Sequence, residues 1–98
     1  QWLDLGTGAG FPGLVIAMMR PEWSVRMVEA RRLRVDWLRD QAQIAGLRNA
    51  EVIAGRVEAA DAQPATVISA RAFAPLPRLV ANAHRFSTSD TIWLLPKG

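Results

Sequence analysis

The first thirteen residues constrain the fold of this chain more than any other stretch. A short apolar run, residues 1–5, leads into a loop with glycine at Gly6, Gly8, Gly10 and Gly13. The six residues after the loop, 14–19, are all apolar and are typical of a buried helix. Glycine lets the backbone turn tightly and lets a ligand approach without a Cβ in the way. The order strand, glycine loop, helix predicts the opening of a nucleotide-binding βαβ unit.

Two kinds of ligand fit this loop. Residues 8–13 satisfy G-x-G-x-x-G, the dinucleotide fingerprint, although glycine-rich turns also occur as plain structural turns. Asp4 stands two residues before Gly6 and extends the string to D-x-G-x-G-x-G. A pyrophosphate gains little from a carboxylate there, whereas a ligand with a cationic sulfonium and an ammonium gains a good deal. The string therefore favours S-adenosylmethionine over NAD, with Asp4, Gly6, Gly8 and Gly10 in the cofactor site.

Length and composition limit what the chain can be. Half of its 98 residues are apolar, which is enough for one modest core. It begins inside an expected strand and stops just past another, so we interpret residues 1–98 as a partial domain from a longer protein.

The net charge of +3 is compatible with a polyanionic partner but does not require one. Without cysteine, disulfides, thiolate metal sites and cysteine nucleophiles are excluded. No apolar run approaches the length of a membrane span, and we expect a cytoplasmic enzyme without membrane or metal partners.

The remaining elements follow from apolar periodicity. Strands are expected at residues 24–29, 50–54, 65–70 and 91–95, with helices at 14–19, 31–46 and 75 to about 86. This alternation predicts an α/β, Rossmann-like fold with a mostly parallel sheet and helices on both faces. Met18 and Met19 are expected to fill the core.

The helix at 31–46 is the most clearly amphipathic segment. Its apolar side is expected to comprise Leu33, Trp37, Leu38, Ile44 and Ala45. Arg31, Arg32, Arg34 and Arg39 stay outside, where they are solvated or contact a phosphate backbone. Gly46 is a natural stop for this helix.

Two titratable residues need a position-based interpretation. Glu29 closes the second expected strand, where a carboxylate suits acceptance of both ribose hydroxyls of a nucleoside. A solvated strand-end acid is the alternative, and the glycine loop upstream favours the ribose role. His84, near the end of the last expected helix, is typical of a helix-terminus cation or a surface residue.

Four strings together resemble a known family. They are LGTGAGFPG at 5–13, RVE at 56–58, SARAFA at 69–74 and PKG at 96–98. In this order and spacing they closely resemble the guanine-N7 methyltransferase of small-subunit ribosomal RNA, also called glucose-inhibited division protein B. The resemblance covers essentially the whole chain, and the first and third strings are specific to that family among methyltransferases.

The resemblance implies a class I methyltransferase that transfers a methyl group from S-adenosylmethionine to N7 of one guanine in 16S rRNA of the small ribosomal subunit. Family members are longer, with additional N-terminal helices and C-terminal strands. By resemblance, Gly6 and Phe11 line the methionine and adenosine side of the cofactor. Val57 and Glu58 flank the adenine, and Arg71 lies beside the cofactor. The oligomeric state is left open.

The residues after the fourth expected strand agree with this chemistry. Methyltransferases of exocyclic amines commonly carry a [DNS]-P-P-[FYW] box there, but this chain has Arg71-Ala72-Phe73-Ala74. Guanine N7 already has an in-plane lone pair, so the enzyme mainly has to hold it in line with the methyl–sulfonium bond. Arg71 is the candidate catalytic residue. Phe73 either stacks on a base or packs against other side chains of the protein. Lys97 could contact an RNA phosphate.

Two other classes of function stay open at this stage. An NAD(P)-dependent oxidoreductase would need a catalytic Tyr, Lys or His near the cofactor, and the chain has no tyrosine. A non-catalytic RNA-binding fragment would retain the fold without the activity.

Overall fold

Helices and strands alternate along most of the chain, and the residues that the structure describes contain eight such elements. The computed structural model of the protein describes residues 1–6, 12–57, 60, 63–70, 81 and 83–95. The elements are, in chain order, β1 (Trp2–Leu5), α1 (Gly13–Met19), β2 (Val25–Glu29), α2 (Arg32–Ile44), β3 (Ala50–Ala54), β4 (Val67–Ala70), the 3₁₀ helix η2 (His84–Phe86) and β5 (Ile92–Leu94). Within these residues, no helix has both the length and the hydrophobicity that a membrane crossing requires.

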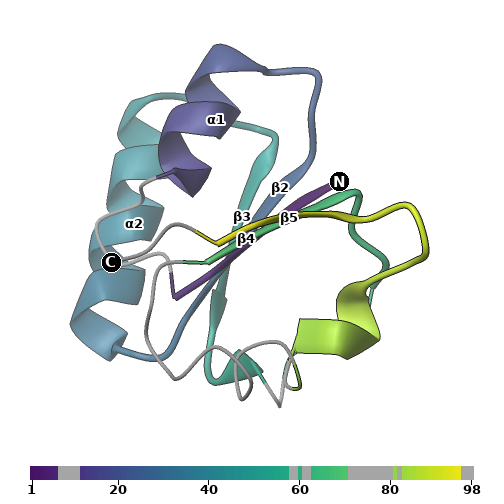
Figure 1. Ribbon diagram of the computed structural model, residues 1–98. Coiled ribbons are helices and arrows are strands. Elements are labelled where there is room, and N and C mark those ends of the chain that lie inside the picture. The colour runs from purple at the N-terminus through teal and green to yellow at the C-terminus, as the bar shows by residue number, and fades with distance from the viewer. Residues whose placement is uncertain (7–11, 58–59, 61–62, 71–80, 82, 96–98) are drawn as a thin grey trace.

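The five strands form one parallel sheet in the order β3-β2-β1-β4-β5. The chain runs outward from β1 through β2 to β3, and then crosses back to β4 on the other side of β1 (Figure 1). The predicted α/β class and parallel sheet are confirmed. The strand order reverses between β1 and β4, and this is where an open α/β sheet forms its ligand crevice.

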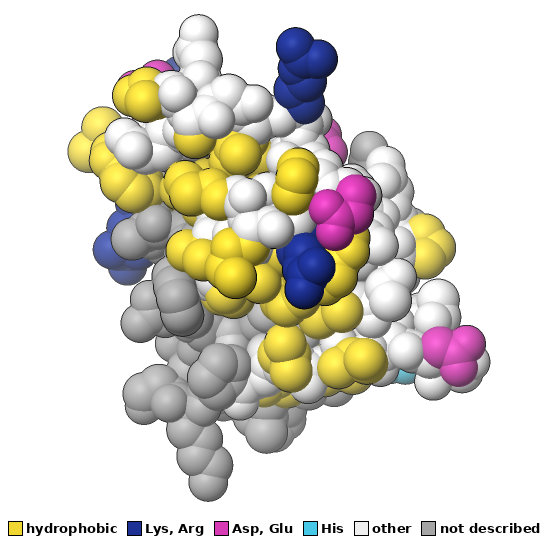
Figure 2. All heavy atoms as spheres, turned by 90° about the horizontal axis from the view of Figure 1, so that it is seen from above, with side chains coloured by type: hydrophobic (Ala, Val, Ile, Leu, Met, Phe, Trp, Pro, Cys, Tyr) yellow, Lys and Arg dark blue, Asp and Glu magenta, His cyan; other side chains and the backbone are white. Residues whose placement is uncertain are grey.

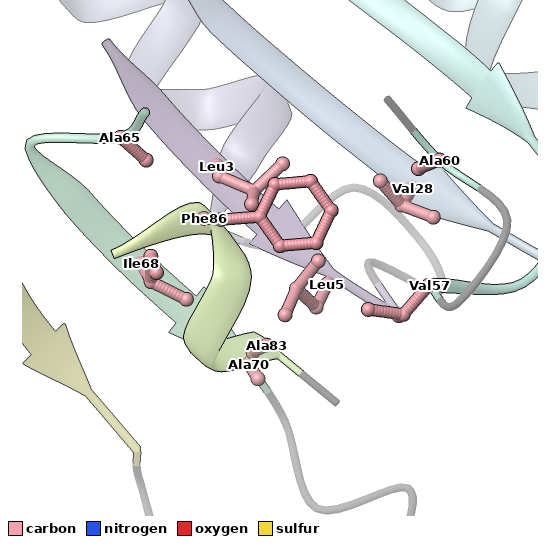
Figure 3. Close-up of a cluster of buried hydrophobic side chains, with 10 residues drawn as sticks. All are labelled: Leu3, Leu5, Val28, Val57, Ala60, Ala65, Ile68, Ala70, Ala83 and Phe86. Carbon is pink, nitrogen blue, oxygen red and sulfur yellow. The ribbon is translucent and has the colours of Figure 1, made fainter. Parts of the chain in front are cut away.

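A separate hydrophobic cluster covers each face of the sheet. On one face α1 and α2 pack over Trp2, Val25, Met27 and Val52 through Leu14, Ala17, Val35, Leu38 and Ala42. On the other face Phe86 of η2 is fully buried in the cluster that Figure 3 draws. That cluster consists of Leu3, Leu5, Val28, Val57, Ala60, Ala65, Ile68, Ala70, Ala83 and Phe86. The predicted cover of both faces is therefore confirmed.

The predicted packing of α2 is wrong for most of its large side chains. Leu33 is 84% exposed, Ile44 is 78% exposed and Trp37 is 45% exposed, and Ala45 is exposed as well. The buried residues are Val35, Leu38 and Ala42. At 3.6 residues per turn these three lie about half a turn away from Leu33, Trp37 and Ile44. The helix carries two apolar stripes, and the sheet buries the one with the smaller side chains.

The end of α1 also differs from expectation. Met18 is 48% exposed and Met19 is 69% exposed, so neither fills the core. Only Gly13, Leu14 and Ala17 of this short helix are buried, because one side of it faces the sheet.

Figure 2 shows hydrophobic side chains gathered across the face of the molecule seen from above, with single basic and acidic side chains among them.

Up to the helix predicted at 75–86, and again at the last strand, element boundaries differ from the predicted ones by at most two residues, and one boundary has a clear chemical cause. Gly46 has a φ of +67°, a conformation that glycine adopts at low cost. Its N–H donates to the carbonyl of Gln43 and the N–H of Leu47 donates to that of Ala42, the paired bonds that close a helix. Gly46 is thus the stop that the sequence predicted. Most of the helix expected at 75–86 lies outside the described residues.

Candidate functional site

The carboxyl ends of three neighbouring strands meet at the point where the strand order reverses. Leu5, the last residue of β1, pairs with Val28 of β2 on one side and with Ala70 of β4 on the other. The N–H of Gly6 donates to the carbonyl of Val28 at 2.8 Å, and Gly6 has a φ of +62°. The turn out of β1 therefore begins in a conformation that favours glycine, beside the end of β2.

Asp4 holds the two ends of the glycine loop together. Its side chain is fully buried. Oδ2 accepts a hydrogen bond from the backbone N–H of Gly13 at 2.9 Å, and Oδ1 accepts one from the hydroxyl of Ser69 at 2.9 Å. The indole N–H of Trp2 donates to the same hydroxyl at 2.7 Å. One carboxylate thus connects β1, β4 and the first residue of α1.

This internal role was missed by sequence reasoning, which assigned Asp4 to the ligand. Hydrogen bonds from a backbone N–H and a hydroxyl satisfy a buried carboxylate that would otherwise be costly to desolvate. Direct contact between Asp4 and a cofactor stays a prediction.

Gly13 is required by close packing. A Cβ added there would lie 2.7 Å from Oδ2 of Asp4 and 2.7 Å from Cγ of Met27. Both neighbours are fully buried, so neither moves aside easily. This glycine lets α1 approach the strands, which is the role of the third glycine in a nucleotide-binding loop.

Glu29 lies at the end of β2, next to the turn that leaves β1. The residue is 5% exposed, and its Oε2 accepts a hydrogen bond from the backbone N–H of Arg31 at 2.9 Å. Arg31 is the N-cap of α2, so the carboxylate lies at the start of that helix. The predicted placement at the tip of the second strand is confirmed, and contact with ribose hydroxyls stays a prediction.

Val57 belongs to the connection that follows β3. It is 5% exposed and packs in the cluster of Figure 3. Its carbonyl accepts a hydrogen bond from the N–H of Ala60 at 3.2 Å and another from Nη2 of Arg85 at 2.6 Å. Sequence reasoning did not identify Arg85, because the contact joins residues 28 apart in the chain. His84, beside it, is exposed at the start of η2.

Several predicted site residues lie outside the described residues. They are Gly8, Gly10, Phe11, Glu58 and Arg71, together with Phe73 and Lys97. The structure describes Gly6, Glu29 and Val57, which follow or end β1, β2 and β3 on the carboxyl side of the sheet. Among the residues described, no group of three or more His, Cys, Asp or Glu could hold a metal ion.

Sequence comparison relates the chain to one family. The family model GidB, rRNA small subunit methyltransferase G, matches residues 1–98. A ribosomal RNA small subunit methyltransferase G from Erythrobacter litoralis is 57% identical over 97 residues, covering 99% of this chain and 47% of the relative. One from Novosphingobium aromaticivorans is 56% identical over 98 residues, covering all of this chain and 43% of the relative. The chain thus spans about half the length of these curated relatives.

Structural comparison gives the fold class. The YcgJ protein from Bacillus subtilis superposes with a TM-score of 0.79 at 25% identity, over 96% of this chain and 42% of that one. Coclaurine N-methyltransferase, solved with N-methylheliamine and SAH, superposes with a TM-score of 0.84 at 19% identity, over 96% and 29%. The fold is that of class I S-adenosylmethionine-dependent methyltransferases, as the sequence predicted.

Proposed function

Since the chain belongs to the GidB family of rRNA small subunit methyltransferase G, we propose that it forms the cofactor-binding part of an enzyme that methylates guanine N7 in 16S rRNA. In this proposal the methyl donor is S-adenosylmethionine, and the target is one guanine at the 527-type position. The partner is the small ribosomal subunit in the cytoplasm. The match covers less than half of the relatives, which supports interpreting residues 1–98 as part of a longer methyltransferase domain.

One observation carries this proposal. The Gly6 turn and the buried Glu29 carboxylate adjoin at the carboxyl ends of β1 and β2, beside the point where the strand order reverses. A nucleoside bound there would meet glycine backbone on one side and a carboxylate acceptor on the other. Charge-assisted hydrogen bonds from ribose hydroxyls to Glu29 would orient the cofactor. Asp4 supports this arrangement by binding the N–H of Gly13, at the start of α1.

The methyl transfer needs little from the protein beyond placement. Guanine N7 attacks the methyl carbon with its own lone pair, and the methyl–sulfur bond breaks as the sulfonium becomes a neutral thioether. No proton has to leave N7, so neither a general base nor a cysteine nucleophile is required, and the chain has no cysteine. The work of the site is to align the two reactants and to stabilise the moving charge. Arg71, which follows β4, is our candidate for holding the guanine or its phosphate.

A cofactor titration followed by an activity assay tests the proposal. The full-length gene product should bind S-adenosylmethionine and not NADH in a calorimeter. It should then transfer tritiated methyl to small ribosomal subunits or 16S rRNA. Binding of NADH alone would identify an oxidoreductase instead. Binding of RNA with neither cofactor would identify a non-catalytic RNA-binding protein.

A further inference from the structure

The side chain of Arg85 connects η2 to the segment that follows β3. Its Nη2 donates to the carbonyl of Val57 at 2.6 Å and to the carbonyl of Ala60 at 2.5 Å. These two carbonyls lie on either side of residues 58–59. The N–H of Ala60 also donates to the carbonyl of Val57, so the two residues belong to one backbone turn. A single guanidinium nitrogen therefore bridges both ends of this turn.

The packing around the turn comes from the neighbour of Arg85. Phe86 is fully buried and shares the cluster of Figure 3 with Val57 and Ala60. The guanidinium of Arg85 lies 4.5 Å from the centre of the Phe86 ring, a cation–π contact. Two adjacent residues of η2 thus hold the turn in different ways, since Phe86 packs beside its side chains and Arg85 binds its carbonyls. The hydrogen bonds are charge-assisted and stronger than neutral ones.

We propose that Arg85 is a positioning residue for the cofactor, which acts by fixing the backbone of Val57, one of the two adenine-flanking residues Val57 and Glu58. The inference rests on the proposed function, in which these two residues adjoin the adenine of S-adenosylmethionine. Arg85 itself acts through the backbone carbonyl oxygens of Val57 and Ala60, which side-chain substitutions at those positions do not remove. The adenine end of the site then depends on a residue of η2, 28 positions away in the sequence.

The structure also predicts which substitutions matter. Methionine at position 85 keeps the long apolar stem of arginine and removes every donor. Lysine keeps the charge but has a single ammonium group in place of the planar fork, so it should hold the turn less well. Arg48 is a matched control, because it is an exposed arginine in the connection before β3, at the other end of that strand.

The test measures cofactor binding and methyl-transfer kinetics in the full-length gene product. Arg85→Met should raise the Kd and the KM for S-adenosylmethionine about fivefold or more, because apparent affinity falls with the fraction of molecules whose turn is in place. The kcat at saturating cofactor and the KM for rRNA should stay at their wild-type values. Arg85→Lys should give an intermediate Kd, and Arg48→Met should match the wild type.

Several results would overturn the inference. A folded Arg85→Met protein with the wild-type Kd for S-adenosylmethionine would show that cofactor binding does not need the hydrogen bonds from Arg85 to this turn. A raised KM for rRNA with an unchanged cofactor Kd would show that Arg85 contacts RNA. If Arg85→Met does not fold, wild-type Kd values in both Arg85→Lys and Arg85→Gln would refute the proposal in its place. A wild-type protein that binds no S-adenosylmethionine would instead refute the proposed function itself.

Discussion

Replacing Gly13 with alanine should disturb the fold and the cofactor site together. The added Cβ would lie 2.7 Å from Oδ2 of Asp4, 2.7 Å from Cγ of Met27 and 3.0 Å from its sulfur. Asp4 cannot move away freely, because its carboxylate also accepts the hydrogen bond from Ser69. Either α1 moves away from the strands or the buried side chains shift. Both changes displace the loop that connects β1 to α1.

The change in the free energy of unfolding combines a small gain in helix propensity with larger costs of crowding. Alanine gains at most about 1 kcal/mol over glycine in a helix interior, and Gly13 is only the first residue of α1. Overpacking a buried site costs about 1–3 kcal/mol, and straining a hydrogen bond to a charged group costs up to about 1.5–3 kcal/mol more. We therefore expect Gly13→Ala to lower the free energy of unfolding by about 1–5 kcal/mol, and to weaken binding of S-adenosylmethionine.

Urea unfolding of the full-length gene product, with cofactor titration at low urea, measures both effects. Gly46→Ala is the control, since an added Cβ there meets nothing within 4 Å but must adopt a φ of +67°. Strain in that conformation costs about 1–2 kcal/mol, and it lies at the end of α2 away from the loop. Gly46→Ala should lose stability while keeping the cofactor Kd. A Gly13→Ala protein as stable as the wild type, with an unchanged Kd, would refute the close-packing argument.

Three further predictions address the ribose contact, the catalytic arginine and the edge of the sheet. Glu29→Gln should weaken binding of S-adenosylmethionine by about 1.5–3 kcal/mol, the range for hydrogen bonds to a charged group; unchanged affinity in calorimetry would remove Glu29 from the site. Arg71→Lys should reduce methyl transfer and Arg71→Ala should reduce it about tenfold or more, equivalent to about 1.4 kcal/mol; wild-type rates would leave Arg71 a structural residue. The isolated 98-residue chain should self-associate, since β5 is an edge strand with Ile92 57% exposed, and a concentration-independent monomer in sedimentation would contradict this.

The parts of the fold that the sequence predicts are those in which a local signal agrees with the global arrangement. The strands were located by apolar runs of the right length. Gly46 ends α2 because its backbone conformation is one that glycine favours wherever a helix stops. Glu29 lies at the tip of β2, as predicted, because the residue pattern typical of a strand ends at this position.

The sequence does not predict the features that depend on contacts between distant parts of the chain. The helix α2 has two apolar stripes, and only the sheet decides that Val35, Leu38 and Ala42 are buried while Leu33 is not. Asp4 was assigned to a ligand because its partners, Ser69 and Gly13, become neighbours only after folding. Arg85 was missed for the same reason, since its acceptors are backbone carbonyls that have no sequence signature.

The position of the transferred methyl group tests the central claim most directly. The full-length gene product would be incubated with tritiated S-adenosylmethionine and small ribosomal subunits that lack the modification. The rRNA would then be cleaved chemically at N7-methylated guanines. The account predicts methyl incorporation with strand scission at one guanine of 16S rRNA. Incorporation without scission, with the label on another atom or another base, would contradict the reaction proposed for this family member.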